Sequence, residues 1–193
     1  MTLRKDANLA LVAAGAAMLL VLPFVTTFND LLTSWAMQLS VIAPFEAVAE
    51  VEARMAAGLL HLVGIHAAVA GGGYLLVDDF QGRQQQLYIT WNCVGWQSLV
   101  LLGLSFLTGL RGRHPWEARF QVLAIGLLGT MLVNVLRITL VCLLAALAGR
   151  VPAIVFHDYG GTLLILAWLF GFWALAQRWL LPTTADETGE EAE

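Results

Sequence analysis

The stretch FQVLAIGLLGTMLVNVLRITLVCLLAALA, residues Phe120–Ala148, decides the fold of this chain. Its second part, from Met131 onward, is apolar apart from Asn134, Arg137 and Thr139. A run of this length and composition is typical of a helix buried in a bilayer. An ionised guanidinium in hydrocarbon costs at least ~2.5–3.5 kcal/mol, and an arginine does not deprotonate to avoid that cost. Arg137 is therefore predicted to face a polar cavity or a partner, which makes it a candidate for a functional site.

The composition of the whole chain agrees with a membrane environment. Of the 193 residues, 59% are hydrophobic and only 12% are charged, whereas soluble domains carry about 25% charged residues. The chain has two cysteines, Cys93 and Cys142, and no Cys-x-x-Cys pair, which argues against a disulfide framework. An integral membrane protein with one compact helical bundle is predicted.

Four apolar runs are long enough to cross a hydrocarbon core. They are Asn8–Phe28, Val94–Leu110, Phe120–Ala148 and Gly160–Leu181. We therefore predict an all-α integral membrane protein with four transmembrane helices, with five or six as the alternatives. Met55–Leu76 is the candidate for a fifth span, although its three consecutive glycines and two histidines argue against it.

Basic residues predict the orientation of these spans. They gather before the first span, between the second and third, and at the end of the fourth, at Arg4, Lys5, Arg111, Arg113, Arg119 and Arg178. The excess of Lys and Arg in cytoplasmic loops then places both termini in the cytoplasm. Four parts follow: residues 1–28 with the first span, 29–92 as an extracytoplasmic cap, 93–181 as a membrane core with three spans, and 182–193 as a disordered acidic tail. The Gly149–Tyr159 loop is predicted to lie outside with the cap.

The cap is too long to be a structureless loop in a compact protein. Leu31–Leu39 and Val48–Ala70 are predicted to be helices lying in the membrane interface, with Leu59, Leu62, Val63 and Ile65 on one side. Tyr74–Phe80 and Gln84–Trp91 flank a turn that contains Gly82, a pattern typical of a short β-hairpin. This hairpin leads directly to Cys93.

Depth along the spans brings three chemically capable side chains to one level. Arg137 lies about 26 Å along a helix that begins at Phe120, close to the far edge of a ~30 Å core. Asn134 is one turn away on the same helix face. Cys93 precedes the second span and His157 precedes the fourth, both at the predicted outer side.

A thiol, an imidazole and a guanidinium at one level suit acyl transfer. A nearby cation lowers the pKa of a thiol and activates it as a nucleophile. His157 has the chemistry to accept the proton of Cys93 and return it to a leaving amine. Arg137 has the chemistry to stabilise an oxyanion or orient a carbonyl, braced by Asn134.

Three blocks carry a resemblance to a known family. They are Trp91-Asn92-Cys93-Val94-Gly95-Trp96, Asn134-Val135-Leu136-Arg137-Ile138 and Phe156-His157-Asp158-Tyr159-Gly160. In this order, each beside a membrane span, they resemble the exosortase/archaeosortase family, of which this chain looks like a short form. The resemblance covers roughly residues 67–172.

The resemblance implies a membrane-embedded cysteine transpeptidase or protease. Cys93, Arg137 and His157 match the family's catalytic positions, and Asn134, Asn92, Gly95 and Asp158 are the expected supporting residues. The implied partner is an exported protein with a C-terminal sorting signal, made of a short motif, a transmembrane helix and a basic cluster. The family is thought to cleave at the motif and transfer the product to an envelope anchor.

No metal or organic cofactor is expected, since His61 and His66 are off the i, i+4 spacing of a helical metal site. Three alternatives remain open. The chain is a non-catalytic scaffold of the same fold, or a small anion transporter that uses Arg137. The third alternative is a thiol oxidoreductase with a Cys93–Cys142 pair.

Overall fold

The computed structural model of the protein describes residues 13, 16, 20, 23–25, 27–38, 43–78, 82–112 and 114–181. Most of the predicted first span Asn8–Phe28, and the acidic tail 182–193, lie outside the described residues. Residues 27–38 are helical. The named elements are α2 Ala43–Leu62, β1 Ala67–Val69, β2 Tyr74–Asp78, β3 Gln84–Tyr88, the 3₁₀ turn η1 Trp91–Cys93, α3 Trp96–Gly109, α4 Trp116–Ala148, α5 Arg150–Val155, the π-helical turn η2 Phe156–Gly160, α6 Gly161–Leu175 and the π-helical turn η3 Ala176–Leu180.

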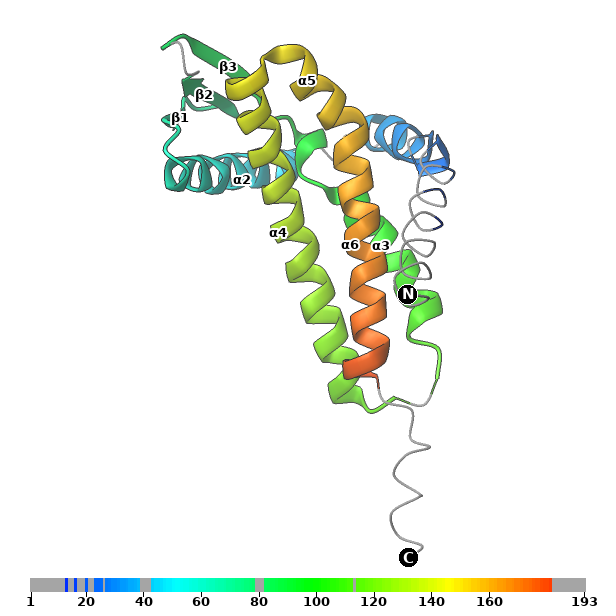
Figure 1. Ribbon diagram of the computed structural model, residues 1–193. Helices are drawn as coiled ribbons and strands as arrows, with labels where there is room; N and C mark the ends of the chain where they lie inside the picture. Colours follow the sequence, from blue (N-terminus) through cyan, green and yellow to red (C-terminus); the bar gives the residue numbers. More distant parts are fainter. Residues whose placement is uncertain are drawn as a thin grey trace, which may run out of the picture.

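Helices α3, α4 and α6 run side by side and form a bundle (Figure 1). Within the described residues, two helical stretches are long and apolar enough to cross a membrane, Trp116–Ala148 and Arg150–Leu180. The surface of α4 is apolar as well, because large aliphatic side chains are exposed along it, at Leu127, Leu128, Leu132 and Leu136. In water such a surface is unfavourable, and in lipid it is not. The bundle is thus the membrane-embedded part of the protein.

The predicted second span forms a shorter helix than the sequence indicates. The apolar run Val94–Leu110 becomes α3, which has 14 residues and is therefore about 21 Å long. That is less than the ~30 Å of a hydrocarbon core. The number of spans accordingly stays a prediction.

α4 continues without a break past Arg137. With 33 residues it is about 50 Å long, so it extends well beyond a hydrocarbon core. Its last turns contact the small sheet, where Gln85 Nε2 donates a hydrogen bond of 3.1 Å to the carbonyl of Ala145. Gly149, with φ of +87°, ends the helix.

The predicted Gly149–Tyr159 loop is wrong. Only Gly149 separates α4 from the next helix, and residues 150–180 form one helical stretch through α5, η2, α6 and η3. His157 therefore stands on a helix, not on a loop. The apolar residues of α5, Val151 and Ile154 among them, continue the helical pattern backward from α6, and this signal favoured a helix.

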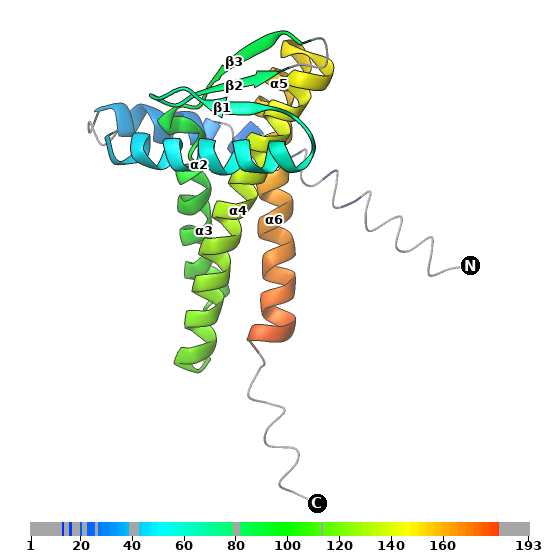
Figure 2. The same cartoon turned by 90° about the vertical axis from the view of Figure 1, so that its left-hand side faces the viewer.

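Helix α2 lies across the end of the bundle, roughly perpendicular to α4 (Figure 2). One stripe of it, at Val51, Met55, Leu59 and Leu62, is apolar and exposed. The opposite side is lined with alanines and is buried against the sheet and α4. An exposed apolar stripe on a helix that crosses the bundle end is typical of an interfacial helix.

The boundaries of this interfacial helix differ from the prediction. α2 ends at Leu62, because Gly64 takes a φ of +82°, and Ile65 is buried rather than part of the exposed stripe. The predicted helix Val48–Ala70 therefore runs too far. Met55–Leu76 as a fifth span is also wrong, since it is divided between α2, β1 and β2.

The antiparallel pairing of the predicted hairpin is confirmed. β2 pairs with β3 in a register that sets Tyr74 opposite Tyr88. The prediction missed β1, which pairs with the other edge of β2 and makes a three-stranded sheet of order β1-β2-β3. The fold is thus mainly helical with a small sheet, and not all-α. We keep the name cap for the described residues of 29–92, which include α2 and the sheet, and we call the end of the bundle that carries them the sheet end.

Two apolar clusters hold the molecule together. The cap cluster is built on α2 alanines, Leu60, Leu75 and Val77, and includes Ile138 and Cys142 of α4. The bundle cluster is built on Leu102, Val122 and Phe172, with Trp168 and Trp173 packed against it. Of the residues singled out by the sequence, Cys142 belongs to the cap cluster and Cys93 packs against it.

Candidate active site

Cys93 lies at the end of η1, directly before α3. Its backbone N–H donates to the carbonyl of Thr90 at 2.8 Å, which fixes the turn. The thiol Sγ is 3.5 Å from Thr90 Oγ1 and 3.8 Å from His157 Nε2. The structure thus brings the predicted thiol and imidazole into direct contact, although 64 positions separate them in the chain.

His157 lies in the π-helical turn η2, between α5 and α6. Single π-helical turns inside α-helices are frequent at functional sites. The Nδ1 atom of His157 lies 3.0 Å from Asp158 Oδ1, on the side of the ring opposite Cys93. A carboxylate on Nδ1 favours the tautomer that leaves Nε2 free to accept the proton of the thiol.

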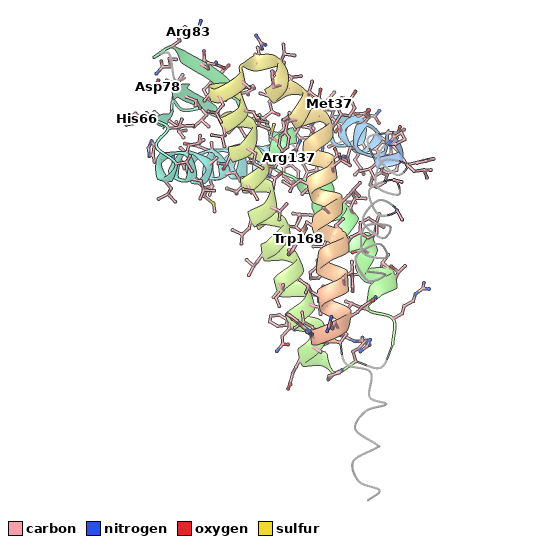
Figure 3. The ribbon with its side chains drawn as sticks, in the orientation of Figure 1. Met37, His66, Asp78, Arg83, Arg137 and Trp168 are labelled. Atoms are coloured by element: carbon pink, nitrogen blue, oxygen red, sulfur yellow. The ribbon has the colours of Figure 1, made fainter. Side chains whose placement is uncertain are left out.

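Arg137 holds the same turn from α4. Its Nη2 donates to the carbonyl of His157 at 3.4 Å, and its Nη1 donates to Asn134 Oδ1 at 3.5 Å. The Nε atom is buried without a hydrogen-bond partner. A Cβ on Gly161 would stand 2.3 Å from Nε, so only glycine admits the guanidinium here. Figure 3 shows Arg137 within the bundle, nearer the sheet end than Trp168.

Asn134 links three parts of the site. It is 1% exposed, and its Nδ2 donates to the carbonyl of Cys93 at 2.8 Å and to Glu52 Oε2 at 3.0 Å. Gly95 makes this possible, since its φ is +70° and a Cβ there would lie 2.7 Å from Asn134 Cγ. Asn134 therefore fixes the thiol-bearing turn relative to Arg137.

Glu52 of α2 is the site residue that sequence reasoning missed. Its side chain is 2% exposed, it accepts from Asn134, and its Oε1 has no hydrogen-bond partner. Burial raises the pKa of Glu52 to about 7, against the hydrogen bond from Asn134, which lowers it. A signal did exist: Glu46, Glu50 and Arg54 follow an i, i+4 spacing, and Glu52 falls about 160° away on the helix.

The thiol of Cys93 is activated by its surroundings. Burial raises its pKa, but the hydrogen bonds from His157 and Thr90 lower it by more, so the pKa falls from 9.0 to about 7. At neutral pH a large part of Cys93 is then thiolate, the form that attacks a carbonyl.

Asn92 lies apart from this group. It is exposed, and its Oδ1 accepts from Gln97 Nε2 and from Thr33 Oγ1, the latter at 3.2 Å. Gln97 Nε2 also donates to Thr33 Oγ1 at 3.3 Å. Asn92 thus ties helical residues 27–38 to the start of α3.

Two cavities reach the site. The larger, of about 940 Å³, lies between β3 on one side and α4 and α5 on the other, and Cys93, Arg137 and His157 belong to its lining. We call it the β3 cavity. The smaller, of about 340 Å³, is lined by residues of helix 27–38, α3 and α6, together with Arg137 and His157. Both volumes are in the range of small ligand sites.

Cys93 and Cys142 are both free thiols, and Cys142 is buried in the cap cluster. In the described part of the chain no group of three His, Cys, Asp or Glu side chains is arranged to hold a metal ion.

A membrane-embedded helical bundle with a thiol, an imidazole and a guanidinium at one end defines the class of this protein. The transmembrane exosortase family model matches residues 5–174. The chain therefore belongs to the transmembrane exosortase family, as its three sequence blocks indicated. Searches of the curated proteins and of the solved structures found no match.

Proposed function

We propose that this protein is a membrane cysteine transpeptidase or protease that cleaves the C-terminal sorting signal of exported proteins. Membership of the transmembrane exosortase family supports the general role. The observation that carries the proposal is the 3.8 Å contact between Cys93 Sγ and His157 Nε2, in a cavity large enough for a peptide. Cys93 is the nucleophile, His157 the general acid and base, and Arg137 the group that positions the substrate carbonyl.

The reaction runs in two steps. Cys93 gives its proton to His157 Nε2, and the thiolate attacks the carbonyl carbon of the scissile amide. Collapse of the tetrahedral intermediate breaks the C–N bond, and His157 returns the proton to the leaving amine. A hydroxyl, an amine or water then attacks the thioester, gives its proton to His157 and releases the product. Collapse of this second intermediate breaks the C–S bond, and the released Cys93 thiolate takes the proton back from His157.

The arrangement in the membrane follows the basic residues. The sheet end faces the outside of a cell membrane, and both termini face the cytoplasm. The first span ends at residue 28, the cap at residue 92 and the membrane core at residue 181. The substrate's transmembrane helix approaches through lipid, where the bundle exposes apolar side chains. Its scissile bond then stands at the level of Cys93.

Thiol alkylation across pH tests the activated site. In a Cys142→Ala background Cys93 is the sole cysteine, so iodoacetamide labelling reports it alone. We expect half-maximal labelling near pH 7, and a shift toward pH 9 in His157→Ala. A profile centred near pH 9 in both proteins would contradict the proposed activation.

A search for the acyl-enzyme tests the chemistry. Protein purified from its native membranes carries substrate as a thioester on Cys93, which hydroxylamine cleaves. We expect a hydroxylamine-sensitive polypeptide adduct in the wild-type protein and in Cys142→Ala. We expect none in Cys93→Ala. A scaffold or a transporter forms no adduct, and an adduct that persists in Cys93→Ala would remove Cys93 from the mechanism.

A further inference from the structure

Strand β3 is the edge of the sheet, and its free edge carries unpaired backbone groups. The order β1-β2-β3 leaves no strand beyond β3 among the described residues. Ile89 N–H donates to the Gly73 carbonyl at 2.9 Å, so Ile89, Leu87 and Gln85 are the residues that bond to the neighbouring segment. In an antiparallel pair the alternate residues point the other way. The backbone groups of Gln84, Gln86 and Tyr88 therefore face the free edge.

This edge lacks the usual protection. Natural edge strands are blunted by charged side chains, proline or bulges. β3 has the sequence Gln-Gln-Gln-Leu-Tyr, without charge or proline, and pairs in continuous register with β2. An open, regular edge of this kind is a template for another strand.

The free edge of β3 lies along the cavity that reaches the thiol. Residues 83–89 line one side of the β3 cavity, and Arg137, Val141 and Gly149 mark the course of α4 along the other. Cys93 lies at one end of this cavity. Toward the other end, Gln85 of β3 donates a hydrogen bond to the carbonyl of Ala145 in α4. At ~3.3 Å per residue, the length of β3 accommodates about four or five extended residues.

We propose that the β3 cavity binds the substrate polypeptide as an added β-strand, on the side that precedes the scissile bond. This rests on the proposed function, because the bound segment becomes the acyl group on Cys93. The carbonyl at Cys93 is the C-terminal end of that segment, and the chain from Tyr88 leads to Cys93 within a tight turn. The added strand therefore runs parallel to β3, from Gln84 toward Tyr88.

The segment that follows the scissile bond lies elsewhere. In the proposed function it continues into a membrane helix, which remains beside the bundle in lipid. The β3 cavity is lined by β3 and by the end of α4, including Val141 and Cys142. Figure 2 shows that this end of α4 projects past α2, on the side of the sheet. Main-chain pairing gives affinity without reading side chains, so sequence preference arises from the side chains that line the opposite wall.

Hydrogen exchange compares the two edges of the sheet without any mutation. The probe is the acyl-enzyme from native membranes, measured before and after hydroxylamine. We expect the amides of Gln84, Gln86 and Tyr88, which face the free edge, to exchange roughly tenfold or more slowly in the acylated form. The free edge of β1, residues 67–69, is the internal control and does not change. Equal exchange at β3 in both forms would overturn strand addition.

Proline variants give the second measurement. Gln86→Pro removes one edge N–H without touching the bonds to β2, and Val69→Pro makes the same change on the outer edge of β1. We expect the adduct to fall about tenfold or more in Gln86→Pro and to persist in Val69→Pro, with Cys93 alkylation unchanged in both. An adduct at wild-type level in Gln86→Pro contradicts the proposal.

The two levels of the hypothesis fail separately. An adduct on Cys93 without protection at β3 removes strand addition and leaves the transpeptidase in place. Absence of any hydroxylamine-sensitive adduct in wild type removes both.

Discussion

The cap cluster and the bundle cluster are packed with different residues, and the difference reflects their solvents. The cap cluster uses small side chains, chiefly the alanines of α2, against Leu60 and the strands. The bundle cluster uses large aromatic side chains, Phe172, Trp168 and Trp173, around a few aliphatic ones. Burial from water stabilises the first, whereas close contact alone stabilises the second, because lipid is as apolar as the helices. The polar network of Asn134 joins the two regions, since it contains Glu52 of α2 and Arg137 of α4.

Two leucine truncations measure this difference. Leu60 in the cap cluster is 0% exposed and Leu102 in the bundle cluster is 2% exposed. We expect Leu60→Ala to cost about 2–5 kcal/mol, since it loses burial from water and leaves a cavity. Leu102→Ala loses only contacts and costs less. Thermal unfolding in detergent measures both, and equal shifts in Tm would remove the distinction between the clusters.

Gly95→Ala tests how closely the turn that carries Cys93 must pack against Asn134. The added Cβ would lie 2.7 Å from Asn134 Cγ and takes an unfavourable φ of +70°. A displacement of about 1 Å in a catalytic group costs about 10²-fold, so we expect a loss of that size in the Cys93 adduct. Gly103→Ala, inside the helix α3 that begins directly after Gly95, is the control, because nothing lies within 4 Å of a Cβ at Gly103. Similar adduct levels in the two variants would show that the contact at Gly95 is loose.

Arg137→Lys separates geometry from charge at the same junction. An ammonium group lacks the fork that reaches both the His157 carbonyl and Asn134 Oδ1. We expect adduct formation to fall about tenfold while the protein remains folded. A lysine variant that forms the adduct at the wild-type level would show that the site needs only the positive charge of residue 137 and not the guanidinium fork.

Glu52→Gln tests whether the buried carboxyl group of Glu52 makes the stability of the protein depend on pH. The pKa of Glu52 in the folded protein is raised to about 7 from 4.5. Its contribution to stability is thus present below pH 4.5 and is lost as the pH rises through 7. We expect the Tm of wild type to fall by several degrees between pH 5 and pH 8, and the fall to be smaller in Glu52→Gln.

Glu50→Gln is the control for this prediction. Glu50 pairs with Arg54 at the surface, 2.6 Å apart, and lies two residues from Glu52. We expect its pH dependence of Tm to follow wild type. Identical profiles in all three proteins would show that the Glu52 carboxylate titrates as it does in water.

Much of the architecture was predictable because it follows local rules. The length and apolar composition of Phe120–Ala148 predicted a long membrane helix, and Gly82 between two strand-like runs predicted the β2–β3 hairpin. The predicted loop Gly149–Tyr159 was wrong, because a helix begins again at Arg150, directly after Gly149. β1 was missed because three residues, Ala67–Val69, are too few for a periodic signal.

The amino-acid sequence by itself determined that this is a membrane protein and which family it belongs to, and it predicted the thiol, the guanidinium and the imidazole of the proposed site. These depend on composition, on the energetic cost of a charge in lipid, and on blocks of adjacent residues. Only the tertiary structure decided that His157 stands on a helix within 3.8 Å of Cys93, and that Asn92 turns toward Thr33. It also decided that Glu52, 82 positions from Asn134, completes the network. The reason is that such contacts depend on how α2 crosses the bundle, and no local pattern encodes a crossing of distant elements.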